Sequence, residues 1–250
     1  MALNGDVMNH FAKAYAKSMF NHFKNLDENG RRKELEKLGY FTDADIDTYV
    51  KDPDLFKNDS LVDKFSNIIL TEGIAGSGKS GGVFDSTVRV LKEIKPEILD
   101  NVFLVHSTLK NAEQSLGNLK LTGKAFSSSN DEKDNDLIRY FYSDYTDNYN
   151  GKVKLVNGNI IHNFKLKEDL KDLPKIIFLD EASRYDYVKM KLLSEAAQHY
   201  GIAVFAAGDF DQISAKSRIQ VDSKTIDFAP NRLNFIRSPK LGLSFRTLNS

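Results

Sequence analysis

The chain contains no cysteine, and this absence excludes two kinds of stabilised small fold. Neither a disulfide framework nor a cysteine-ligated zinc site can form, so we expect a reducing compartment. Net charge is also absent, because 35 Lys and Arg balance 35 Asp and Glu. The overall charge therefore indicates no nucleic-acid partner, although a local basic face can be balanced elsewhere. The five histidines lack the spacing of metal ligands.

Long apolar runs are missing as well. No segment has the length and composition of a signal peptide or a membrane span. We therefore expect no membrane partner and a cytoplasmic protein, or one that acts in a host cell or virion if its source is viral. The 250 residues, 41% of them hydrophobic, suit one large globular domain with or without a small appendage.

The most informative segment that is present has the phosphate-loop pattern G-x-x-x-x-G-K-[ST], at residues 73–80. A predicted strand precedes it and a predicted helix at 82–93 follows, which is the context that this motif requires. Glycines let backbone N–H groups converge on an anion, and the helix adds its positive end. Lys79 would reach the β- and γ-phosphates of ATP, and the Ser80 hydroxyl would ligate Mg²⁺. The predicted nucleotide-binding residues are Gly73, Ala75, Gly76, Ser77, Gly78, Lys79 and Ser80.

From residue 64 onward, apolar runs alternate with helical patterns, which predicts an α/β fold with a central parallel sheet. The predicted strands are apolar throughout, as expected where both faces of a sheet are covered. They lie at Ile68–Thr71, Val102–His106, Ile176–Leu179 and Ile202–Ala207, with a helix over Ala182–Tyr200 between the last two. We expect residues 63–250 to form an ATPase domain and residues 1–62 a small helical appendage.

The appendage is predicted to contain three helices. Apolar residues recur at helical spacing from Val7 to Phe23, a second helix is expected over 31–38, and Thr42 has the character of an N-cap for a third. Two interpretations stay open: the appendage packs against the main domain, or it binds a protein partner.

Residues 127–165 interrupt the alternation and form a predicted insertion. Its first part, 127–136, is polar and predicts an exposed loop. The Asn157-Gly158 turn predicts a hairpin between Val153–Val156 and Asn159–His162. Five aromatic residues lie between these parts, and they could form a small satellite core or stack on nucleic-acid bases: Tyr140, Phe141, Tyr142, Tyr145 and Tyr149.

Two further segments follow apolar strands. Asp180 and Glu181 end one strand in the form of a Walker B element, at the sheet edge where α/β folds bind ligands. Asp180 would hold Mg²⁺ through its water shell opposite Ser80, and Glu181 would orient and deprotonate the attacking water. The next strand leads to Gln212, whose amide suits contact with the γ-phosphate and that water. Arg246, near the end of the chain, is a candidate γ-phosphate contact.

In this order, the segments resemble the superfamily 1 helicases. Residues 73–80 are similar to motif I, 179–182 to motif II, 208–212 to the Gly-Asp-x-x-Gln of motif III, and 244–247 to motif IV. Residues 105–112 lie where motif Ia would lie, and 161–164 are similar to the Thr-x-His-Ser/Phe element. The resemblance implies that Thr108, Lys110, His162 and Phe164 contact a nucleic-acid strand.

The resemblance covers roughly residues 64–250 and implies the first of two RecA-like domains. Motifs V and VI of the second domain are not found, so we expect either a fragment of a longer helicase or a one-domain relative. The implied partners are single-stranded DNA or RNA and a second RecA-like domain, in cis or in trans. Without that domain, hydrolysis should be slow and translocation absent, because translocation needs a cleft between two domains.

The leading functional hypothesis is an ATP hydrolase domain of a nucleic-acid motor, with Mg²⁺ as cofactor and with Glu181, Lys79, Gln212 and Arg246 in catalysis. The alternative is a helicase-like nucleotide-binding switch or structural module, for example of a virus or replication complex, without unwinding activity. A third hypothesis, an unrelated phosphate-loop ATPase, is disfavoured by residues 208–212 and 244–247.

Overall fold

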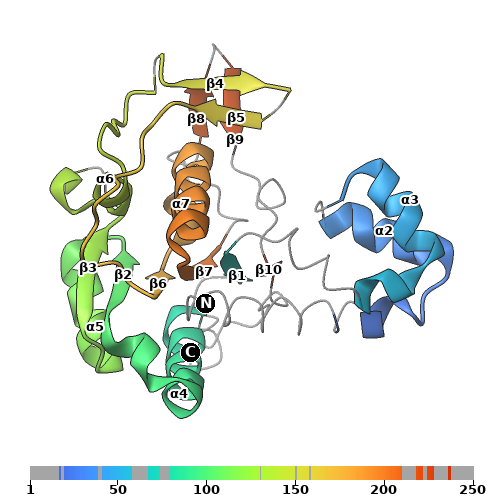
Figure 1. Ribbon diagram of the computed structural model, residues 1–250, viewed down its shortest axis with the longest axis horizontal. Helices are drawn as coiled ribbons and strands as arrows, with labels where there is room; N and C mark the ends of the chain where they lie inside the picture. Colours follow the sequence, from blue (N-terminus) through green and yellow to red (C-terminus); the bar gives the residue numbers. More distant parts are fainter. Residues whose placement is uncertain are drawn as a thin grey trace, which may run out of the picture.

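The computed structural model describes residues 17, 20–38, 41–57, 67–73, 79–129, 131–149, 151–157, 159–209, 218–221, 224–227 and 236–237. These residues form an α/β structure around a six-stranded sheet in the order β10-β1-β7-β6-β2-β3 (Figure 1). Every neighbouring pair of strands in the sheet is parallel. The strands are β1 (Ile68–Glu72), β2 (Val102–His106), β3 (Gly123–Ser127), β6 (Ile176–Leu179), β7 (Ala203–Gly208) and β10 (Ile236–Arg237).

Helices cover both faces of the sheet, with α7 on one face and α4 on the other (Figure 1). Among the described residues, no helix is both long and apolar enough to cross a membrane. The α-helices are α2 (Glu28–Leu38), α3 (Asp43–Lys51), α4 (Phe84–Ile94), α5 (Leu109–Leu119), α6 (Leu137–Phe141) and α7 (Tyr187–Tyr200). Shorter turns are η1 (Pro53–Lys57), η3 (Lys79–Val83), η4 (Pro96–Asp100), η5 (Lys133–Asn135) and η6 (Ala182–Arg184).

The apolar strands supply two cores because successive side chains of a strand point to opposite faces. In β2, Phe103 and Val105 pack with residues of α6 and α7, whereas Val102 and Leu104 pack with residues of α4 and α5. β6 and β7 divide their side chains in the same way. Burial on both faces explains why these strands are continuous apolar runs rather than alternating ones.

The four predicted strands are confirmed to within one residue at either end. β3 was not predicted, because it has no continuous apolar run and lies at the edge of the sheet. Its first residue, Gly123, approaches β2 so closely that an added Cβ would lie 1.7 Å from the carbonyl oxygen of Val102. The prediction of an exposed loop over 127–136 is therefore wrong at its ends, because Ser127, Ser128 and Asp136 are buried.

The predicted helix over 182–200 is broken at its start. η6 ends at Arg184, and α7 begins only after Asp186, whose Oδ1 accepts a hydrogen bond of 2.8 Å from the Lys189 backbone N–H. This N-cap satisfies a donor that the first turn of a helix leaves without a partner. Gly201 ends the helix in the left-handed conformation.

The appendage contains α2 and α3, which pack against each other, and Figure 1 shows them to one side of the sheet. The predicted N-cap at Thr42 is confirmed: Thr42 and Asp45 form a reciprocal capping box. Most of the predicted first helix lies outside the described residues.

The insertion contains α6 and the predicted hairpin, formed by β4 (Val153–Val156) and β5 (Asn159–His162) in antiparallel register. A second hairpin, β8 (Arg218–Val221) with β9 (Lys224–Asp227), was not expected. The five aromatic residues of the insertion pack into the same core as α7, three of them buried. The prediction of a separate satellite core is therefore wrong, because these residues pack inward and extend the main core.

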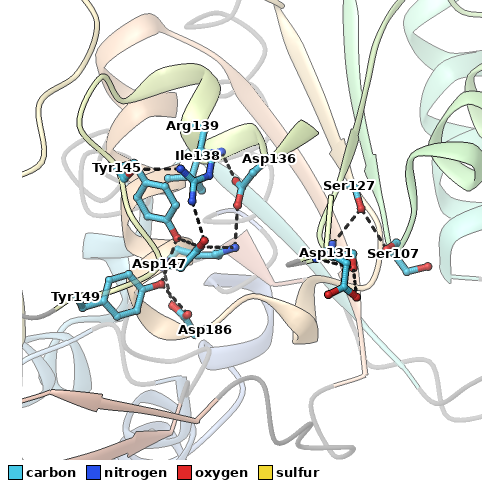
Figure 2. Close-up of polar contacts among 12 residues, drawn as sticks. Ser107, Ser127, Asp131, Asp136, Ile138, Arg139, Tyr145, Asp147, Tyr149 and Asp186 are labelled. Carbon is cyan, nitrogen blue, oxygen red and sulfur yellow. Dashed lines mark hydrogen bonds and ion pairs between the residues drawn. The ribbon is translucent and has the colours of Figure 1, made fainter. Parts of the chain in front are cut away.

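A buried polar network joins the insertion to α7 (Figure 2). The ammonium of Lys189, a residue 6% exposed, lies 2.8 Å from Asp136 Oδ2 and 3.6 Å from Asp147 Oδ1. Asp136 is also the N-cap of α6, since its Oδ1 accepts the Ile138 N–H at 2.7 Å. On α7, the N-cap Asp186 accepts the hydroxyl of Tyr149 at 2.8 Å. The two N-caps thus anchor both helices to one charged cluster.

Candidate functional site

Four central strands end at one edge of the sheet and bring the sequence motifs together there. The carboxyl ends of β1 and β7 meet where the Gly73 N–H donates to the carbonyl of Gly208 at 3.2 Å. β6 leads to Asp180 at the same edge, and β2 ends there in His106. Loops at the carboxyl ends of parallel strands are where open α/β sheets bind ligands.

Parts of the predicted phosphate loop can be placed. Gly73 is buried beside β7, whereas Ala75, Gly76, Ser77 and Gly78 lie outside the described residues. Lys79 and Ser80 begin η3, a π-helical turn that leads directly into α4. In the described part of the chain, a Cβ added at Gly81 or Gly82 of this turn would meet nothing within 4 Å, and both glycines are exposed.

A cavity of about 330 Å³ lies next to this turn. Gly81 and Phe84 line it from η3 and α4, Leu119 from α5, and Asp180 from the end of β6. Gly81, which follows Ser80, and Asp180, the first acid of the predicted Walker B segment, therefore line one space, although they are far apart in the sequence.

Hydrogen bonds hold Asp180 in place. Its backbone N–H donates to the carbonyl of Val105 at 2.9 Å, and its Oδ1 accepts the Glu181 N–H at 2.8 Å. Its Oδ2 lies 3.1 Å from His106 Nε2. This hydrogen bond, opposed by burial, raises the pKa of His106. These contacts orient the Asp180 carboxylate, which lines the cavity.

Glu181 adopts the left-handed conformation, with φ of 53°. Its carboxylate forms an ion pair of 2.7 Å with Arg184 Nε; Glu181 is half-buried and Arg184 is exposed. At the end of β7, a buried Oδ1 of Asp209 has no hydrogen-bond partner in the described part of the chain. Gln212 and Arg246 lie outside the described residues, so their predicted roles remain predictions.

The four predicted nucleic-acid contacts divide into two groups. Thr108 and Lys110 are exposed at the start of α5, where the Thr108 hydroxyl caps the helix by accepting the Asn111 N–H at 3.3 Å. His162 and Phe164 belong to the insertion and pack inward. His162 Nε2 lies 2.6 Å from Glu195, and Phe164 is buried against the ring of Tyr145. Only the first group lies beside the candidate site.

The pairing of His106 with Asp180 was not predicted from the sequence. His106 ends one apolar strand and Asp180 directly follows another, but the pairing of those strands is not visible in the sequence. Within the described residues, no group of three or more His, Cys, Asp and Glu side chains could hold a metal ion by itself. Any divalent cation at Asp180 would therefore need ligands from the phosphate loop, a bound phosphate or water.

Comparison with known proteins supplies no identity for the chain. No protein-family model matches it, and no curated protein matches it. Inferences about function accordingly depend on the motifs and on the geometry of the sheet edge.

Proposed function

We propose that the chain is an ATP-binding and ATP-hydrolysing domain of the superfamily 1 helicase type with a RecA-like fold. Its hydrolysis would be coupled to single-stranded nucleic acid, with a second RecA-like domain in cis or in trans. The observation that carries the proposal is the shared cavity, which Gly81 lines from the turn after the phosphate loop and Asp180 lines from the Walker B segment.

The strand order supports the proposal. β7 lies between β1 and β6, so the phosphate loop and Asp180 start two strand spacings apart. Neighbouring strands are about 4.8 Å apart, which makes this separation about 10 Å. Such a gap suits a phosphate with a hydrated cation between the two motifs, rather than direct contact between them.

The side chains at this edge suit a hydrated Mg²⁺ that is bound together with a phosphate. The Asp180 carboxylate lines the cavity, and Mg²⁺ commonly retains several waters and binds one or two carboxylates plus phosphate oxygens. Ser80 and Asp180 would be its protein partners, on opposite sides of the phosphates. When bound, Mg²⁺ would neutralise charge that develops on the phosphate oxygens.

The protein residues would contribute position and charge. Lys79 would bind the β- and γ-phosphates, Gln212 and Arg246 would contact the γ-phosphate, and Glu181 would accept the proton of the attacking water. Glu181 is paired with Arg184 in this structure, so it must leave that ion pair to act as the base. Losing one preorganised charged contact of this kind slows turnover by roughly 10²–10³-fold.

The same ion pair favours a second candidate function, a nucleotide-binding switch. If Arg184 holds Glu181 throughout, ATP would bind and hydrolysis would be negligible. Such a module could still change the sheet-edge loops when ATP replaces ADP.

ATP hydrolysis measured with and without single-stranded DNA and RNA tests the proposal, with Lys79→Ala as the control. Turnover that one polymer stimulates and Lys79→Ala abolishes is the expected result. ATP binding without any turnover, with and without polymer, would favour the switch. Polymer-independent turnover that survives Lys79→Ala would contradict both functions.

A further inference from the structure

His106 and Asp180 are neighbours because of strand register. β2 and β6 are parallel, and Val105 pairs with Leu179 as the last pair of the ladder. The next residue of each strand is therefore His106 on one side and Asp180 on the other, at the edge that faces the cavity. Their side chains are 19% and 11% exposed, and Nε2 and Oδ2 are 3.1 Å apart.

Backbone contacts fix the orientation of the imidazole ring. The Ser107 N–H donates to His106 Nδ1 at 2.7 Å. A backbone N–H can only donate, so Nδ1 must be the acceptor, and the proton of the neutral ring lies on Nε2, facing Asp180. The carbonyl of His106 in turn accepts the Ser128 N–H at 2.8 Å, which ties the end of β2 to the segment after β3.

We propose that His106 is a positioning residue for Asp180: its Nε2–H holds Oδ2 and so fixes the orientation in which the carboxylate lines the cavity. The inference rests on the proposed function, in which Asp180 holds the hydrated Mg²⁺ of ATP. A hydrogen bond to a metal-binding carboxylate restricts its rotation and sets how much charge it presents. Removing such an outer-shell partner typically weakens metal affinity or activity by about 10–100-fold.

Two substitutions separate this role from a merely local one. In His106→Gln, the side-chain amide places an N–H near the position of Nε2, so the donor to Asp180 is kept and the acceptor for Ser107 is lost. In His106→Asn, the amide oxygen replaces Nδ1, so the acceptor for Ser107 is kept and the donor to Asp180 is lost. Each variant thus retains the contact that the other one lacks.

The readout is binding of Mn²⁺ to the full chain in the presence of ADP, followed by electron paramagnetic resonance, beside ADP affinity without metal. We expect His106→Asn to weaken Mn²⁺ binding by roughly tenfold or more and His106→Gln to stay within about threefold of wild type. Metal-free ADP affinity should be unchanged in both variants, which also serves as the test that they are folded.

If His106→Asn binds Mn²⁺ like wild type and His106→Gln binds it more weakly, this inference is overturned and the proposed function still stands. Equal behaviour of the two variants, whether intact or impaired, would overturn it as well. Failure of the wild-type protein to bind ADP at all would overturn the proposed function, and the role of His106 with it.

Discussion

The buried network around Lys189 permits a matched pair of substitutions. Asp136 and Asp186 are both N-cap residues, of α6 and α7, and both are more than nine-tenths buried. Replacing either by Asn keeps an N-cap acceptor of about equal quality. The two differ in their charge environment, because the Asp136 carboxylate lies 2.8 Å from the Lys189 ammonium whereas Asp186 accepts hydrogen bonds from a backbone N–H and the Tyr149 hydroxyl.

Asp136→Asn should be strongly destabilising. Removing one partner of a buried ion pair costs about 3–5 kcal/mol, because the other charge is left buried. Asp147 remains 3.6 Å from the same ammonium, which favours the low end of that range. For a chain of 250 residues, about 3 kcal/mol corresponds to a fall in Tm of about 6–12 °C.

Asp186→Asn should leave the stability of the protein unchanged or raise it at neutral pH. Burial raises the pKa of the Asp186 carboxyl above its ordinary value, despite hydrogen bonds and the charge of Lys189 that lower it. The pKa of Asp186 is therefore higher in the folded state than in the unfolded state. The carboxyl stabilises the folded protein fully at pH values below its unfolded-state pKa, and this stabilisation is lost as pH rises through its folded-state pKa. At pH 7 its charge is therefore a cost that Asn removes, and the benefit should shrink as pH falls.

Urea unfolding of wild type and both variants at pH 7 and pH 5 measures these free energies directly. The account predicts that Asp136→Asn unfolds at a much lower urea concentration and that Asp186→Asn equals or exceeds wild type at pH 7. If the two variants lose stability equally at pH 7, the assignment of Lys189 to Asp136 is refuted.

Other residues give three further predictions. Glu181→Gln should retain ATP binding and stop hydrolysis, and turnover near the wild-type rate would exclude Glu181 as the base. Gly123→Ala should lower Tm, because its Cβ would overlap the neighbouring strand. Gly117→Ala should raise stability by up to about 1 kcal/mol, because Gly117 lies within α5 and no described atom is within 4 Å of an added Cβ. Equal Tm values for the two variants would contradict this expectation. The hydrogen bond from Lys152 lowers the pKa of Asp144, so its stabilisation exists above the unfolded pKa and is lost as pH falls through the folded one. Asp144→Asn should therefore cost less than about 1 kcal/mol at pH 7 and less still in acid, and a constant loss across pH would contradict the ion-pair interpretation.

Much of the sheet could be predicted because its central strands are buried on both faces. A segment such as Ile176–Leu179 has to be apolar at every position, and that pattern needs no knowledge of its neighbours. Only the last two residues of β3 are buried, and the strand approaches β2 closely at Gly123. Its sequence therefore lacks the continuous apolar run that identifies the central strands. Asp186 could have been recognised as an N-cap, since it directly precedes an apolar helical pattern.

Less of the candidate site could be predicted from the sequence. Its motifs identify Asp180 by local pattern, but the contact with His106 depends on the register between β2 and β6, which pairs residues far apart in the chain. The burial of Lys189 is equally non-local, because acids from α6 and the following loop surround it. A lysine in a helix is ordinarily exposed, and nothing in the sequence of α7 marks this one as an exception.

The central claim is that residues 73–80 and Asp180 form an ATP site. Calorimetric titration of the full chain with Mg²⁺–ATP tests it most directly, with Lys79→Ala as the test variant and Lys110→Ala as a charge-matched control. The account predicts saturable binding that Lys79→Ala abolishes and Lys110→Ala preserves in the absence of nucleic acid. Absence of binding by the wild-type protein, or equal binding by Lys79→Ala, would contradict it.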